Sequence, residues 1–345
     1  MRVWVTGGFF DQSGECFVEE VDLATGTRER LVTLIPPAEF LVPTKGFTGA
    51  RWLDPRTLLV ASFSAVWRFD VPTWACTGIL HQPDFNDLHD VHVAHDEGRL
   101  FVCNTGLDGI ESFDLNGRFL GRHSLSPTWF DARRQDGWAV ERHQFANLLA
   151  SGWSRSAAPE FVRAKGENYG GDGPRPEFHR RLVRDYAHPN HVSIINGRLA
   201  VTLLAAKEVR CLRTFETIAR FEGHPHDAES FDGLVWTTTT DGFIQGWDPR
   251  GPVWKLAERY DSAATGHLGW CRGILASEEG VAVALTQMHG RPQYAWREES
   301  VEATETSVLW LERGSGRLLG RVAFGGERHA KLFAIMSTSC PIGPT

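Results

Sequence analysis

The chain has 345 residues, of which 42% are hydrophobic and 23% are charged. This composition is typical of a soluble globular protein and excludes a disordered or membrane-embedded chain. The formal net charge of -7 argues against nucleic acid as a partner, because binding a phosphate backbone needs a basic face.

Cysteine spacing and apolar run lengths indicate the compartment. The 6 cysteines lie far apart without a CxxC pair, and no apolar run approaches the ~20 residues of a membrane-spanning helix. The N-terminal stretch MRVWVTGGFF is interrupted at Gly7 and Gly8, which is too early for a secretory signal. We therefore expect reduced thiols, no membrane partner and a cytoplasmic location.

The elements expected along the chain form one repeating unit. Each unit has an apolar strand, a short turn, an alternating strand that ends at a charged residue, a tight turn and a further strand. About six copies are recognised: RVWVTGG with CFVEEVDLATGTRERLVTL from Cys16, TLLVASFSAVWRFD from Thr57, RLFVCNTGLDGIESFD from Arg99, RLAVTLLAAKEVRCLR from Arg198, LVWTTTTDGFIQGWD from Leu234, and VAVALTQ from Val281 with SVLWLERGSGRLLGRVAF from Ser307.

A further β-type segment precedes each apolar strand. These segments are FTGARWL, HDVHVAH, HVSIING, HDAESFD, CRGILAS and HAKLFAI. Four strands repeated at about 40 residues are typical of a propeller blade. The sequence therefore predicts an all-β fold, a single six-bladed β-propeller domain over residues 1–345. Seven blades stay open as an alternative, since one blade could lie in the long stretch without repeats.

The two ends of the chain are expected to close the ring. The first unit lacks an inner strand, and HAKLFAI near the C-terminus lacks outer ones. Pairing Met1–Gly8 with Arg328–Ser337 would complete one blade and remove an open sheet edge.

Two segments depart from the repeat. Residues 124–187 form a long insertion between blades, expected to be a lid over one mouth, an interface element or a plain surface insertion. Residues 288–306 form a smaller rim insertion. Neither segment shows the strand pattern of a blade.

Histidines recur where the innermost strands begin. Aligning these strands on their following turns places one residue of each blade in register: Gly49, His89, His191, His226, Cys271 and His329. Inner strands begin at one mouth, so these residues should converge on the axis. Imidazole suits iron, manganese, zinc, copper or nickel better than magnesium or calcium. We predict that the four histidines bind one divalent transition metal ion, with iron as the preferred metal. A structural role for each histidine is the alternative, and His92 or His188 could replace His329.

Three residues are candidates for catalysis around this ring. Glu229 is the candidate general base, although it reaches the axis only if the chain after His226 is bulged or still a loop. Arg272 could orient an anionic group of the substrate, or pair with Glu229 to join two blades. His188 would line the entrance. Asp90 and Asp227 directly follow ring histidines and could fix their tautomers.

The repeats resemble the broad propeller superfamily that includes the gluconolactonase-like and YVTN-type propellers. The set His89, His191, His226 and His329 is similar to the four-histidine iron centre of carotenoid-cleavage oxygenases and to the manganese site of oligogalacturonate lyases. This resemblance implies a metal-dependent enzyme, and the first hypothesis is a non-haem iron oxidoreductase that acts on a small organic substrate. A manganese or zinc lyase or hydrolase, and a non-catalytic protein-binding propeller, are the alternatives.

Overall fold

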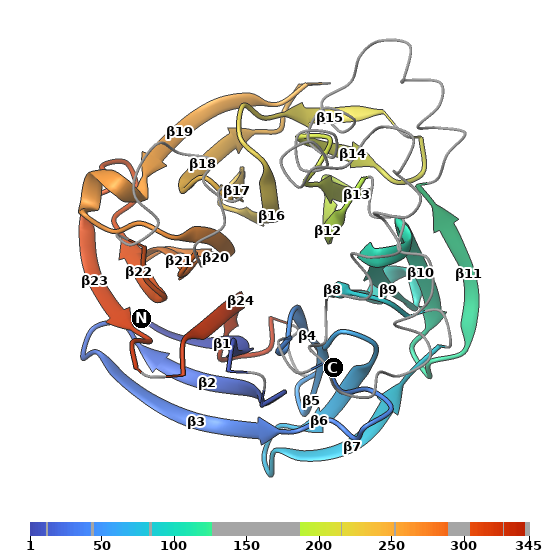
Figure 1. Ribbon diagram of the computed structural model, residues 1–345. Coiled ribbons are helices and arrows are strands. Elements are labelled where there is room, and N and C mark those ends of the chain that lie inside the picture. Colours follow the sequence, from blue (N-terminus) through green and yellow to red (C-terminus); the bar gives the residue numbers. More distant parts are fainter. Residues whose placement is uncertain are drawn as a thin grey trace, which may run out of the picture.

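The computed structural model describes residues 1–11, 13–42, 45–82, 85–125, 187–214, 216–251, 253–288, 304–326 and 328–341. These residues form six antiparallel four-stranded sheets that surround a central axis like the blades of a propeller (Figure 1). The predicted six-bladed β-propeller is therefore confirmed. The predicted insertions over 124–187 and 288–306 fall almost entirely outside the described residues.

Each blade runs from an inner strand at the axis to an outer strand at the rim. From inside to outside, the blades are β24-β1-β2-β3, β4-β5-β6-β7, β8-β9-β10-β11, β12-β13-β14-β15, β16-β17-β18-β19 and β20-β21-β22-β23. The inner strands are β24 (Ala330–Ser337), β4 (Ala50–Asp54), β8 (Leu88–Ala94), β12 (Pro189–Ile195), β16 (Pro225–Phe231) and β20 (Trp270–Ser277).

The remaining elements complete the blades. The second strands are β1 (Arg2–Phe9), β5 (Thr57–Ala61), β9 (Arg99–Asn104), β13 (Arg198–Leu203), β17 (Leu234–Thr239) and β21 (Gly280–Thr286). The third are β2 (Cys16–Asp22), β6 (Val66–Asp70), β10 (Gly109–Asp114), β14 (Glu208–Cys211), β18 (Phe243–Asp248) and β22 (Ser307–Leu311). The outer strands are β3 (Thr27–Leu34), β7 (Ala75–Leu80), β11 (Phe119–Ser124), β15 (Thr217–Arg220), β19 (Lys255–Asp261) and β23 (Leu318–Ala323). Short 3₁₀ turns are η1 (His95–Glu97), η2 (Thr105–Leu107) and η5 (Ser262–Thr265).

Strands from the two chain ends close the ring, as predicted. β1 pairs antiparallel with β24, in a register that runs from Val3 opposite Ser337 to Phe9 opposite Ala330. The apolar core lies between neighbouring blades: Trp4 of the closing blade, for example, packs beside Trp52 of the next one, with ring centroids 5.1 Å apart. All six cysteines are free thiols. Within the described part of the chain, no helix is long and apolar enough to cross a membrane.

A β-bulge near the start of every inner strand sets what faces the axis. In each blade two consecutive residues lie opposite one residue of the second strand. The six pairs are Thr48-Gly49, His89-Asp90, Asn190-His191, His226-Asp227, Arg272-Gly273 and Phe333-Ala334. A bulge inverts the alternation of side chains beyond it. Glu229, three residues after His226, therefore lines the axis, because its strand has the bulge that this position requires.

Candidate functional site at the propeller axis

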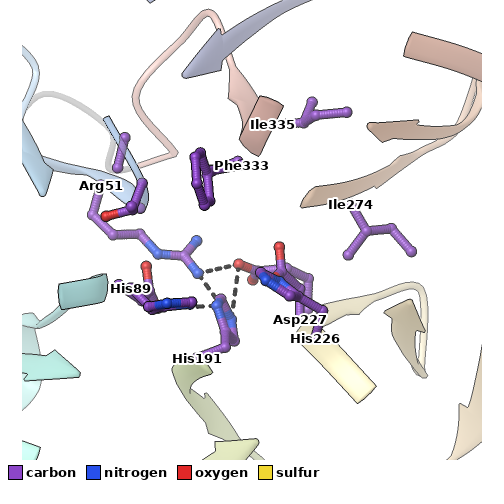
Figure 2. A pocket seen from close by; sticks show the side chains of 14 residues that line it. Arg51, His89, His191, His226, Asp227, Ile274, Phe333 and Ile335 are labelled. Carbon is purple, nitrogen blue, oxygen red and sulfur yellow. Dashed lines mark hydrogen bonds and ion pairs between the residues drawn. The ribbon is translucent and has the colours of Figure 1, made fainter. Parts of the chain in front are cut away.

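The end of the axis where the inner strands begin is here termed the upper mouth, and the other end the lower mouth. A narrow axial cavity lies between them, with about 340 Å³ of empty space when its openings are included, and it is lined by His89, His191, His226, Glu229 and Phe333 among others. Figure 2 shows the side chains of Arg51, His89, His191, His226 and Phe333 directed toward one another across the axis. The blades thus bring together residues that are far apart in the sequence.

Three cationic side chains surround the ring of Phe333 at the upper mouth. The Nζ atoms of Lys45 and Lys331 lie 5.4 and 5.9 Å from its centroid, and the guanidinium carbon of Arg272 lies 4.2 Å away. The guanidinium of Arg272 also stacks on Trp270 at 4.6 Å. These three residues, together with Phe333, are called the cation cluster below.

Lys331 is the unusual member of the cation cluster. Its side chain is only 5% exposed, and its amino group has no hydrogen bond or ion pair within the described residues. Burial lowers the pKa of Lys331 well below its usual value, and the positive charges of Lys45 and Arg272 lower this pKa further. A protonated amine buried without a carboxylate partner is costly, so an anion bound from outside the protein would favour the ammonium form.

Lys45, unlike Lys331, has a carboxylate partner among the described residues. Its ammonium forms an ion pair with Asp87, whose carboxylate also lies 3.5 Å from Nε2 of His89. Burial opposes the charge on Asp87, but Lys45 and His89 hold the pKa of Asp87 well below its usual value. Burial and Lys45 lower the pKa of His89, so its imidazole is neutral at neutral pH. The ring of His188 meets that of His89 edge-on at 4.9 Å.

His226 and Asp227 form a histidine–carboxylate pair beside the cation cluster. Oδ1 of Asp227 lies 2.6 Å from Nδ1 of His226, and both residues line the axial cavity. Burial lowers the pKa of His226 although Asp227 acts in the opposite direction. The imidazole is therefore neutral at neutral pH, with Nδ1–H held by the carboxylate and Nε2 left as the basic nitrogen.

A charged network closes the middle of the axis. Arg51 of β4 forms an ion pair with Glu229 of β16, and its guanidinium lies 3.2 Å from Nε2 of His191 (Figure 2). Nδ1 of His191 lies 2.9 Å from a carboxylate oxygen of Asp90. Burial opposes the imidazolium, but Asp90 and Glu229 raise the pKa of His191 to about 10. Arg51 holds the pKa of Glu229 well below its usual range despite burial.

The predicted histidine ring is assembled only in part. His89 and His226 occupy equivalent bulge positions, with ring centroids 6.0 Å apart. His191 is the second residue of its bulge, one position later than predicted, because the predicted alignment allowed gaps; an ungapped count from the strand ends Ile195 and Phe231 puts Asn190 level with His226. His329 precedes β24, is exposed, and lies 3.4 Å from the side-chain oxygen of Gln287. The structure thus separates His329 from the axial cavity.

The donor set does not fit a metal ion. No three histidine, cysteine or carboxylate side chains in the described ranges are grouped so that they could hold one. His191 lies between the carboxylates of Asp90 and Glu229 and beside Arg51, so it would have to give up these contacts and a proton to ligate a metal ion. The predicted metal on His89, His191, His226 and His329 therefore remains a prediction that this arrangement does not support.

Of the three catalytic candidates, two keep a place near the axis with altered partners. Glu229 pairs with Arg51, and Arg272 belongs to the cation cluster. His188 contacts His89 at the upper mouth, as expected for an entrance residue. Sequence reasoning missed Lys45, Arg51, Lys331 and Phe333. A register that included the bulges would have shown that Arg51 occupies the same position as Glu229, and Phe333 the same position as His226.

Comparisons with known proteins show the fold alone. No family model and no curated protein matches the chain. A chain in the crystal structure of a nidogen/laminin complex aligns with a TM-score of 0.56 and 11% identity, covering 99% of this chain and 100% of that one. A protein of unknown function from Bacteroides caccae aligns with a TM-score of 0.59 and 10% identity, with 100% of both chains covered.

Proposed function

We propose that the protein is an enzyme that binds a small organic anion at the upper mouth and moves a proton on it. The cation cluster would hold a carboxylate of the substrate, and His226 would act as the base. The observation that supports this proposal most is Lys331, a buried amino group beside two cations and without a carboxylate partner among the described residues. A bound carboxylate would supply the missing negative charge.

The chemistry follows from the charges around the two groups. Cations that neutralise a substrate carboxylate make removal of a neighbouring C–H proton easier, because charge that develops on the carboxylate is stabilised. His226 is neutral and its Nδ1–H is held by Asp227, so Nε2 can accept that proton. The sequence-based alternative of a lyase is close to this chemistry, with the cation cluster in the place of the metal.

The metal-dependent oxidoreductase inferred from the resemblance is the second candidate. What favours it is the His226–Asp227 contact, because metal-ligating histidines commonly donate their other ring N–H to a carboxylate. Elemental analysis of protein purified without a histidine tag tests it. Stoichiometric iron that is lost in both His191→Ala and His226→Ala would support this candidate over the metal-free enzyme.

Proton transfer is tested by exchange with solvent. Malonate, succinate, malate and phenylacetate are incubated with the protein in D₂O, and loss of C–H signals next to the carboxylate is followed by ¹H NMR. We expect enzyme-dependent exchange of at least one of these acids, and a loss of about 10²–10⁴-fold in His226→Gln, as for removal of a general base. His95→Gln, which changes a histidine beyond the end of β8, is the matched control and should keep the activity. Exchange that is equal in wild type and His226→Gln would refute the assignment.

A further inference from the structure

A second cavity opens at the lower mouth, on the other side of the charged network. This lower funnel has about 890 Å³ of empty space including its opening, and its apolar walls come from Trp52, Phe231, Leu275 and Met336. It shares Arg51 and Glu229 with the axial cavity. The network of Arg51, His191 and Glu229 thus separates two cavities of different character along one axis.

The lower funnel contains polar nitrogen atoms that have no partner. Both ring nitrogens of His92 are buried and make no hydrogen bond in the described structure, and Nε of Arg51 is in the same condition. Both residues line the funnel. Buried polar groups are nearly always paired, so three such atoms at one apolar cavity indicate that a bound molecule completes the hydrogen bonding.

The charges of this region determine what kind of molecule fits. The cations Arg51 and His191 are already paired with the carboxylates of Asp90 and Glu229, and Asp227 adds a further negative charge that acts on Arg51. Burial and Arg51 lower the pKa of His92 to about 3, which leaves a neutral imidazole with one donor and one acceptor nitrogen. A second anion would meet Glu229 with no cation left to neutralise it. A neutral acceptor avoids that repulsion.

We infer that the lower funnel is a second binding site, which takes a small neutral apolar molecule bearing a carbonyl group. The carbonyl oxygen would accept hydrogen bonds from Nε–H of Arg51 and from a ring N–H of His92. The apolar body would contact Trp52, Leu275 and Met336. This site is distinct in position and in ligand charge from the anion site proposed at the upper mouth.

The test uses three probes of similar shape: acetophenone, which has a carbonyl, ethylbenzene, which lacks it, and benzoate, which is charged. Saturation-transfer NMR titrations give their affinities. We expect acetophenone to bind about tenfold more tightly than ethylbenzene, which corresponds to one net hydrogen bond. Benzoate should bind no better than ethylbenzene at this site. His92→Phe should reduce the advantage of acetophenone, because only the hydrogen bond from Arg51 would remain.

A blocking variant shows where the probes bind. Ser230 is exposed at the edge of the funnel, so Ser230→Trp should fill it and reduce acetophenone binding at least tenfold. Thr25→Trp, at the exposed turn between β2 and β3, is the matched control and should bind as wild type does. Unchanged binding in Ser230→Trp, or equal affinities for acetophenone and ethylbenzene, would overturn the inference. Circular dichroism melts confirm that each variant is folded.

Discussion

Replacing Lys331 by methionine should stabilise the protein. Methionine keeps an unbranched side chain of nearly the same length beside the rings of Phe10 and Phe333, while it removes a buried amino group that has no carboxylate partner in the described residues. Exchanging buried charges for apolar groups of similar volume is neutral or stabilising by about 1–4 kcal/mol. For a chain of this size we expect a rise in melting temperature of roughly 2–8 °C.

Lys45 provides the matched control because it lies on the same phenyl ring but has a carboxylate. In Lys45→Met, Asp87 would keep a buried negative charge without its ammonium partner. Breaking a buried ion pair by removing one partner costs about 3–5 kcal/mol. The two substitutions should therefore shift the melting temperature in opposite directions when followed by differential scanning calorimetry. Destabilisation of similar size in both variants would refute the reading of Lys331 as an unpaired charge.

The pH dependence of this difference has a defined sign. The pKa of Lys331 is lower in the folded protein than its usual 10.5, through burial and the charges of Lys45 and Arg272, with Asp87 and Cys16 acting in the opposite direction. Between the lowered pKa and 10.5 the unfolded chain binds more protons at this residue, so folding stability rises with pH there. The advantage of Lys331→Met over wild type should be largest at low pH and should fade toward pH 10.5.

Two further predictions concern the network and the ring. ¹⁵N NMR should show His191 still protonated at pH 8, because Asp90 and Glu229 raise its pKa to about 10, and Asp90→Asn should lower this pKa. The stabilisation that results from the raised pKa is complete below pH 6.5 and is lost as the pH rises toward 10. A neutral imidazole at pH 7 would contradict the network. Deleting residues 328–345 removes β24 and should abolish cooperative thermal unfolding, and a truncated protein that melts like the full chain would contradict closure of the ring by β1 and β24.

The blades could be predicted from the sequence because their signal is local and repeated. Apolar strands of the TLLVA type, followed by an alternating strand and a turn, recur at a constant spacing, and each copy supports the others. Ring closure followed from counting strands, since the first and last units were each incomplete. Both predictions depend on backbone pairing, which the alternation of side chains specifies.

The candidate site was predicted less well because it depends on irregular positions. The predicted alignment allowed gaps and placed His191 level with His226, although an ungapped count back from the strand ends Ile195 and Phe231 puts Asn190 there. The equivalence of Arg51 and Glu229 was missed because β4 carries a further bulge between Trp52 and Asp54. Lys45 lies in the segment before β4, where no repeat pattern marks it. The state of each imidazole depends on neighbours from other blades, such as Asp90 beside His191, and no single repeat contains both partners.

The central claim is that the cation cluster binds an organic anion, and isothermal titration calorimetry tests it most directly. Malonate, succinate, malate and phenylacetate are titrated into wild type and Lys331→Met, each beside its neutral amide. We predict that at least one acid binds one equivalent per chain, that its amide does not bind, and that Lys331→Met weakens the acid by roughly 10–100-fold, the value of a hydrogen bond to a charged group. If every acid binds no better than its amide, or if the acids bind wild type and Lys331→Met equally well, the account is contradicted.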